Sequence, residues 1–137
     1  MKTVFAACVA GSILICVAGG QESRRALRKG ISVQMATATH AVEMRAADEP
    51  NATVVAITAD GKVFNGIDAV EPAALSALNA GTVYVKADSR APYQRVLMVL
   101  DALHGKSVVL LTAPPENAPK QGQGIVSPYG MKLTVSR

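Results

Sequence analysis

Few residues in this chain could do acid–base chemistry. His40 and His104 are the only histidines among 137 residues, and a catalytic or metal role for either would need convergent partners. Asp101 and His104 are close enough in sequence to be neighbours on a helix. With Ser89 or Ser107 they could suggest a hydrolase triad, but the sequence has neither a nucleophile elbow nor an oxyanion loop. The pattern favours a surface ion pair at a helix C-terminus, and we expect no enzyme activity.

Motifs for metals and nucleotides are also missing from the sequence. Asp60-Gly61 could begin a calcium loop, but the other oxygen ligands are absent, so the pair is typical of a turn. There is no glycine-rich phosphate loop. Both cysteines, Cys8 and Cys16, lie in an apolar N-terminal stretch, which leaves no disulfide or cysteine metal site elsewhere. We therefore expect no cofactor and no metal.

That apolar stretch, residues 3–20, carries no charge. It fits a secretory signal peptide cleaved near Gly20, and it also fits an uncleaved membrane anchor at the lower end of the spanning length. The basic residues within 24–29 oppose an anchor with its N-terminus inside and also hinder translocation behind a signal peptide, so both interpretations stay open. Either one places the folded part outside the cytoplasm.

The basic cluster at 24–29 contributes much of the net charge of +4. Such clusters can bind nucleic acid or anionic surfaces. Behind a translocation segment we expect no nucleic acid, and lipid headgroups or an acidic wall polymer are better candidates. The simplest interpretation is a solvated run next to the membrane.

The most regular pattern lies between residues 82 and 114. Thr82–Ala87 is rich in β-branched and aromatic residues, which predicts a strand. Asp88 and Ser89 offer helix-capping oxygens, and Pro92 suits a first helical turn. A helix is predicted over 93–104, with its inward residues at helical spacing: Val96, Leu97, Leu100 and Leu103.

Gly105 ends this helix in a position suited to left-handed backbone angles. The unbroken apolar run Ser107–Thr112 then predicts a strand buried on both faces. Strand, helix and strand of these lengths indicate a βαβ crossover with parallel strands.

The remaining segments carry weaker patterns. Residues 54–66 predict a hairpin around Asp60-Gly61, and residues 70–78 predict a short helix whose Ala74, Leu75 and Leu78 face inward. Upstream, residues 31–35 alternate as a strand would. Downstream, residues 114–128 have a linker composition rich in Pro and Gly, and residues 131–135 alternate and could add a last strand at an edge.

These segments predict an α+β fold, a small mixed sheet with two helices packed on one face and one βαβ crossover. The predicted organisation is a signal peptide or membrane anchor at 1–20, a basic tether at 21–30, a folded domain at 31–113, and a Pro/Gly-rich tail at 114–137. The domain is small, so its stability should be ordinary and marginal.

The order of these segments resembles the periplasmic domain of the ExbD/TolR family of biopolymer-transport proteins. The positions that carry the resemblance are Asp60 and Gly61 in the hairpin, Asp88 after the strand, Pro92 and Tyr93 at the helix start, and Asp101 within Val-Leu-x-Val-Leu-Asp. We interpret these positions as structural. The resemblance covers roughly residues 31–113 and rests on apolar patterns with a few polar markers.

The resemblance implies an accessory of a proton-motive-force-driven envelope transport system. Its implied partners are a second copy of the chain, an ExbB-like membrane protein, a TonB-like protein and peptidoglycan. The family's aspartate within the transmembrane helix has no counterpart, because residues 3–20 contain no carboxylate side chain, which puts proton coupling by this chain in doubt. The alternative is a freestanding exported domain that binds the cell wall or a small ligand.

Overall fold

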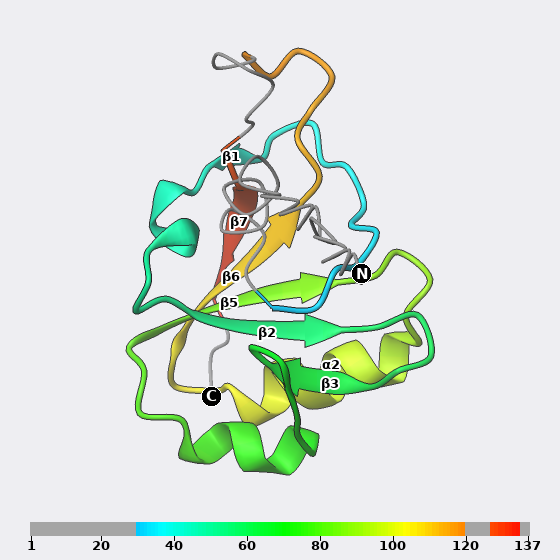
Figure 1. The fold of residues 1–137 in the computed structure, drawn as a ribbon, viewed down its shortest axis with the longest axis vertical. Coiled ribbons are helices and arrows are strands. Elements are labelled where there is room, and N and C mark those ends of the chain that lie inside the picture. Colours follow the sequence, from blue (N-terminus) through cyan, green and yellow to red (C-terminus); the bar gives the residue numbers. More distant parts are fainter. Residues whose placement is uncertain (1–29, 120–126, 135–137) are drawn as a thin grey trace, which may run out of the picture.

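Seven strands form one mixed sheet in the computed structural model, which describes residues 30–119 and 127–134 (Figure 1). The spatial order is β1-β7-β6-β5-β2-β3-β4. The strands are β1 (Val42–Glu43), β2 (Thr53–Ile57), β3 (Val63–Asn65), β4 (Asp68–Ala69), β5 (Thr82–Ala87), β6 (Ser107–Thr112) and β7 (Tyr129–Leu133). The helical segments are the 3₁₀ helices η1 (Arg45–Asp48) and η2 (Pro72–Ala77) and the α-helix α2 (Tyr93–Ala102). The predicted α+β fold is confirmed.

The centre of the sheet is parallel. β5 pairs with β6 in the register Val83↔Val108, and α2 connects them, so the predicted βαβ crossover with parallel strands is confirmed. β2 joins the other side of β5, also in parallel. The β2–β3 hairpin and β4 continue the sheet with antiparallel pairs.

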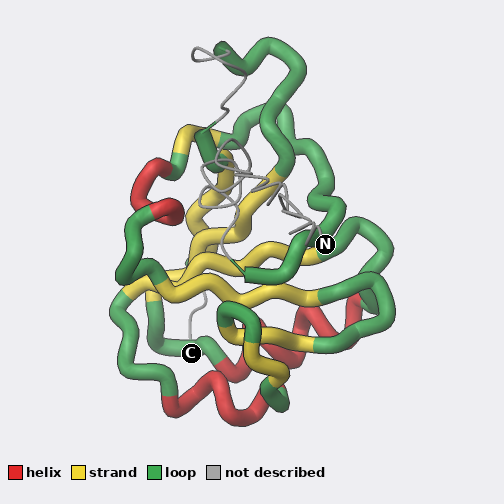
Figure 2. Tube along the Cα trace, in the orientation of Figure 1, coloured by secondary structure: helices red, strands yellow, loops and turns green. Residues whose placement is uncertain are grey.

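Both predicted helices pack on one face of this sheet, where the larger core lies. In Figure 2, η2 and α2 lie together on one side of β2 and β3. Leu75 of η2 and Val99 and Leu103 beside them are almost fully buried. They pack against the alternate strand residues Val55, Ile57, Val63, Val83, Val85 and Val108. Alternation along each strand therefore builds this core.

The opposite face carries a smaller second cluster. Tyr84 and Leu111 lie there with Ala47 of η1. Met35 packs against them from residues 31–37, which we call the N-terminal segment. Burial on both faces explains why Ser107–Thr112 reads as an unbroken apolar run.

The start of α2 differs from the prediction. Pro92 is the N-cap residue, and no side-chain oxygen caps the helix, so the capping roles predicted for Asp88 and Ser89 are wrong. The helix ends at Ala102, with Leu103 as its C-cap, and Gly105 follows in the expected left-handed conformation (φ 79°). Leu97, which was expected to face inward, is 45 % exposed, while Val99 is buried. The face of α2 that packs on the sheet is therefore rotated about the helix axis from the predicted face.

Two other predicted segments differ from the structure. The helix predicted over 70–78 is the 3₁₀ helix η2, in which Leu75 is buried and Ala74 is exposed. Residues 31–35 form no strand, although their burial alternates.

The N-terminal segment crosses the carboxyl ends of β5 and β6. The Ser89 N–H donates to the Gln34 carbonyl at 2.8 Å, and the Ala113 N–H donates to the Ala36 carbonyl at 2.9 Å. Thr37 also forms an isolated bridge with Ala113. The segment is thus fastened to both parallel strands just beyond their last residues.

The strand predicted at 131–135 is β7, which begins at Tyr129 and ends at Leu133. It pairs with β6 through five residue pairs and with β1 on its other side, so it lies inside the sheet rather than at its edge. Val135 lies outside the described residues.

Candidate functional site

Asp88 is the most constrained of the predicted site residues. It follows β5 and is only 6 % exposed. Its carboxylate accepts hydrogen bonds from the Gln34 N–H at 3.0 Å and the Arg90 N–H at 3.0 Å. The Arg90 guanidinium adds a two-point contact through Nε at 2.9 Å and Nη2 at 3.1 Å. Asp88 therefore fastens the N-terminal segment to the end of β5.

These donors lower the pKa of Asp88 well below its ordinary value. The largest cause is the hydrogen bond from the Arg90 side chain, followed by the backbone N–H groups of Arg90 and Gln34. Each donor favours the charged form of the carboxylate. A carboxylate held ionised in this way is a structural acceptor and is poorly suited to exchange protons near neutral pH.

Asp60 and Gly61 meet the start of α2. Gly61 has a left-handed φ of 84°, and a Cβ there would lie 3.1 Å from Arg95 Cγ and 3.5 Å from Pro92 Cγ. Only glycine combines this conformation with so close an approach. The structure thus brings three predicted positions, Asp60, Gly61 and Pro92, to one end of the molecule.

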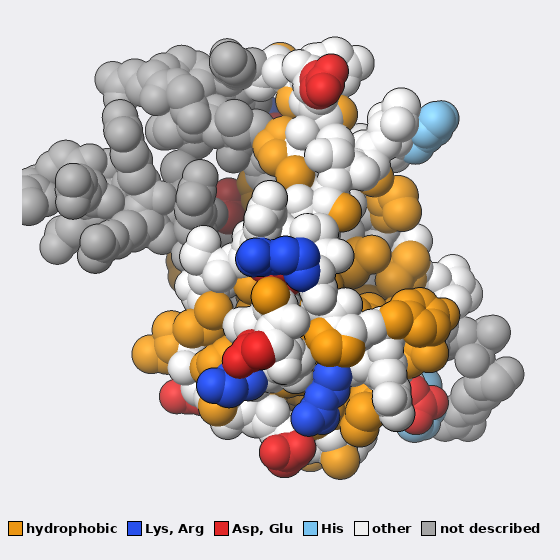
Figure 3. All heavy atoms as spheres, turned by 90° about the vertical axis from the view of Figure 1, so that its right-hand side faces the viewer, with side chains coloured by type: hydrophobic (Ala, Val, Ile, Leu, Met, Phe, Trp, Pro, Cys, Tyr) orange, Lys and Arg blue, Asp and Glu red, His pale blue; other side chains and the backbone are white. Residues whose placement is uncertain are grey.

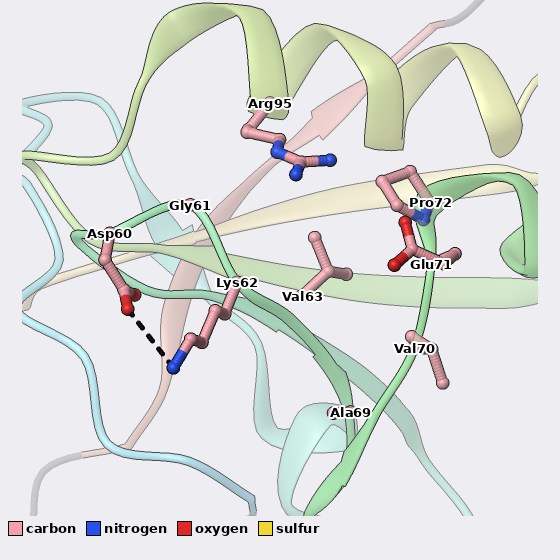
Figure 4. A pocket seen from close by; sticks show the side chains of 9 residues that line it. All are labelled: Asp60, Gly61, Lys62, Val63, Ala69, Val70, Glu71, Pro72 and Arg95. Carbon is pink, nitrogen blue, oxygen red and sulfur yellow. Dashed lines mark ion pairs between the residues drawn. The ribbon is translucent and has the colours of Figure 1, made fainter.

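A pocket of about 270 Å³ opens beside this contact. Figure 4 shows Asp60 and Lys62 on the hairpin, Arg95 reaching from α2, and Glu71 with Pro72 on the other wall. Figure 3 faces the end of the molecule that carries the hairpin turn and the start of α2, where Lys and Arg side chains lie interleaved with apolar ones. The pocket therefore combines charged walls with the apolar side chains of Val63 and Val70.

Two of the four charged side chains in the pocket neutralise each other. Lys62 Nζ lies 3.6 Å from Asp60 Oδ2, and the Thr58 hydroxyl donates to the Asp60 carboxylate. The Thr58 hydrogen bond is the main cause of a lowered pKa at Asp60, and the Lys62 charge adds to it. Arg95 and Glu71 differ, because neither side chain has a hydrogen bond or ion pair within the described part of the chain.

The other predicted positions lie elsewhere. Tyr93 is 76 % exposed at the start of α2, and Asp101 is exposed near its end. The expected Asp101–His104 ion pair is replaced by a contact of 2.6 Å between His104 Nδ1 and the Asp101 backbone carbonyl. His104 thus contacts one of the last helix carbonyls, as its position predicts. The exposed His40 lies between residues 31 and 44, outside any strand.

A second pocket, of about 440 Å³, lies where the loops before β2 and β5 meet. Its lining includes Glu49, Asn51, Asn79 and Tyr84 and contains no cationic side chain. Among the described residues no group of three or more His, Cys, Asp or Glu side chains could hold a metal ion. No helix within 30–119 or 127–134 is long and apolar enough to cross a membrane.

Sequence reasoning missed Arg95 and Glu71. Arg95 lies in the helix predicted over 93–104 but not among its inward-facing residues, and Glu71 lies near the start of the short helix predicted over 70–78. The spacing within each segment carries no sign that they share a pocket. The closest available signal was Gly61, because a required glycine at a turn indicates a neighbouring element.

Comparison of the chain with models of protein families, with curated proteins and with solved structures finds no match.

Proposed function

We propose that this chain is an ExbD/TolR-like accessory of a proton-motive-force-driven envelope transport system. It would act on the periplasmic side of the inner membrane through dimerisation and partner binding. The observation that carries the proposal is the order of elements from β2 to β6: hairpin, short helix, strand, helix and parallel strand, with both helices on one face. The resemblance in the sequence implies this same order.

In this role the folded domain binds partner proteins and catalyses no reaction. The tight hydrogen bonding of Asp88 supports a structural part for that family position. Proton coupling is left to an ExbB-like membrane partner, because residues 3–20 have no carboxylate side chain. The apolar stretch would hold the domain at the membrane, and a TonB-like protein and peptidoglycan would be its periplasmic contacts.

Dimerisation through strand edges is limited by their length, because the edge strands β1 and β4 have two residues each. The outer face of α2 offers more contact area. Tyr93 and Leu97 are 76 % and 45 % exposed, and their i, i+4 spacing makes them neighbours on the helix surface. A second copy would bury these side chains about a two-fold axis.

The alternative function is a freestanding exported binding domain, and the pocket beside Arg95 favours it. The two functions differ in the fate of residues 3–20. An uncleaved anchor agrees with the motor accessory, and cleavage near Gly20 agrees with the freestanding domain.

The test expresses the full chain in a Gram-negative host with a phosphatase reporter after Arg137. We expect an active reporter, an intact N-terminus by mass spectrometry, and recovery in the membrane fraction. An intact but inactive fusion would overturn export itself, while an active fusion with a cleaved N-terminus would transfer the proposal to the freestanding domain. Sedimentation of Leu97→Ser against the wild type checks the dimer, which this change should weaken.

A further inference from the structure

The pocket between the β2–β3 turn, η2 and α2 holds two opposite charges that the described part of the chain leaves unpaired. Arg95 lies on one wall and Glu71 on the other, and their side chains point toward one another in Figure 4. The other two charges, Asp60 and Lys62, pair with each other. From this arrangement we propose that the pocket binds a small zwitterion, an amino acid or short peptide, with its carboxylate on Arg95 and its ammonium group on Glu71.

Arg95 is held in position before any ligand arrives. Its alkyl chain packs on Gly61, with Cγ 3.1 Å from where a Cβ would stand, and the first turns of α2 fix its backbone. Its guanidinium has no partner in the described residues. A held stem lowers the entropy cost of binding, and the planar guanidinium matches a carboxylate through two parallel hydrogen bonds.

The surroundings restrict the ligand to a small one. Pockets for drug-sized ligands have volumes of about 300–1,000 Å³, and this pocket has about 270 Å³. Val63, Val70 and Pro72 add apolar surface to its lining, so a methyl-sized side chain suits it better than a polar one. The alanine series, with one to three residues, has this size and varies only in the separation of its terminal charges.

The inference goes beyond the envelope role and does not depend on it. It concerns a ligand of the folded part, whereas the reporter and the mature N-terminus test where that part lies and how it is held. The ligand proposal can therefore fail while the envelope role holds, and the envelope role can fail while the ligand proposal holds.

The experiment is a nuclear magnetic resonance titration of the ¹⁵N-labelled full chain with alanine, dialanine and trialanine. We expect one of the three to shift the amide signals of Gly61, Lys62 and Val70, with a dissociation constant on the order of 1–10 mM. N-acetylation or C-amidation of that ligand should each weaken binding about three- to tenfold, because each removes one charged contact.

Variants then assign each ligand charge to one side chain. Arg95→Gln should weaken binding of the free peptide by a similar factor and abolish the further effect of amidation. Glu71→Gln should also weaken binding of the free peptide by a similar factor, and it should abolish the further effect of acetylation. Lys62→Gln is the matched control in the same pocket, since Lys62 is already paired with Asp60, and it should change the dissociation constant less than twofold.

Equal binding of free and blocked peptides would overturn the proposal, as would the absence of signal shifts at 50 mM (about 50 times the tighter expected constant). A loss in Lys62→Gln as large as that in Arg95→Gln would also overturn it, because the pocket would then attract anions by overall charge.

Discussion

At the scale of single residues, Asp88 connects two segments that are far apart in the sequence. Its carboxylate accepts from the backbone of Gln34 and from both the backbone and the side chain of Arg90. The donors stabilise the ionised form, so the pKa is lower in the folded state than the ordinary value of 3.8.

We predict that Asp88→Asn lowers the free energy of unfolding at neutral pH. Because the folded-state pKa lies below the unfolded one, the ionised carboxylate contributes its full stability above about pH 4 and loses it as the pH falls toward the folded-state value. Urea unfolding of wild type and variant should therefore differ most at pH 7, and the difference should shrink by pH 3.

The control for this prediction is Asp101→Asn. Asp101 is exposed, and its carboxylate makes no hydrogen bond or ion pair within the described ranges. This variant should follow the wild type at both pH values. If Asp88→Asn unfolded at the wild-type urea concentration at pH 7, the carboxylate would not be a stabilising acceptor.

The sequence placed Asp88 correctly after a strand but assigned it the wrong partner. Helix capping is a local pattern that spacing can suggest, whereas the bond to Gln34 depends on a segment that arrives from much earlier in the chain. The presence of Arg95 and Glu71 in one pocket escaped prediction for the same reason.

At the scale of elements, α2 shows which part of an apolar pattern becomes core. We predict that Leu103→Ala, at a fully buried side chain, lowers the free energy of unfolding by about 2–5 kcal/mol. Leu97→Ala removes the same atoms from a side chain that is 45 % exposed in the single chain, and at dilutions where the chain is monomeric it should cost about 1 kcal/mol or less. Thermal or urea unfolding of the two variants measures the contrast. Equal losses of unfolding free energy in the two variants would mean that Leu97 on the outer face of α2 is also buried in solution.

The sequence predicted the central elements well, because their signals are local. β-branched residues and short apolar runs define β2, β5 and β6, and glycines mark the turns that follow β2 and α2. It could not fix the rotation of α2 about its axis, since Leu97 and Val99 are equally apolar and only the position of the sheet decides which is buried.

At the scale of the whole molecule, β7 closes one side of the sheet. We predict that removing residues 114–137 lowers stability and promotes self-association. β6 would become an edge strand carrying Val109 and Leu111, and an apolar edge is a template for pairing with other chains. Sedimentation and urea unfolding of the truncated and full chains measure both effects. A truncated chain with the same stability and the same oligomeric state as the full chain would contradict the prediction.

Point variants of the full chain test the β6–β7 pairing without shortening the chain. A Cβ at Gly130 would lie 2.8 Å from the Leu110 carbonyl oxygen, so Gly130→Ala should disturb the β6–β7 pairing and destabilise the full chain. Gly81→Ala adds the same methyl group where nothing lies within 4 Å and should have little effect.

The position of β1 beside β7 has a consequence for the order in which the chain can fold as it is synthesised. Val42 pairs with Gly130 and Glu43 with Tyr129, so among the described residues the first strand pairs only with the last. During synthesis, at about 5–20 residues per second, residues 42–43 must wait for some 85 residues, or about 4–17 seconds, before their partner exists. The β2-to-β6 unit can assemble within that interval, leaving the closure of this edge as the final step.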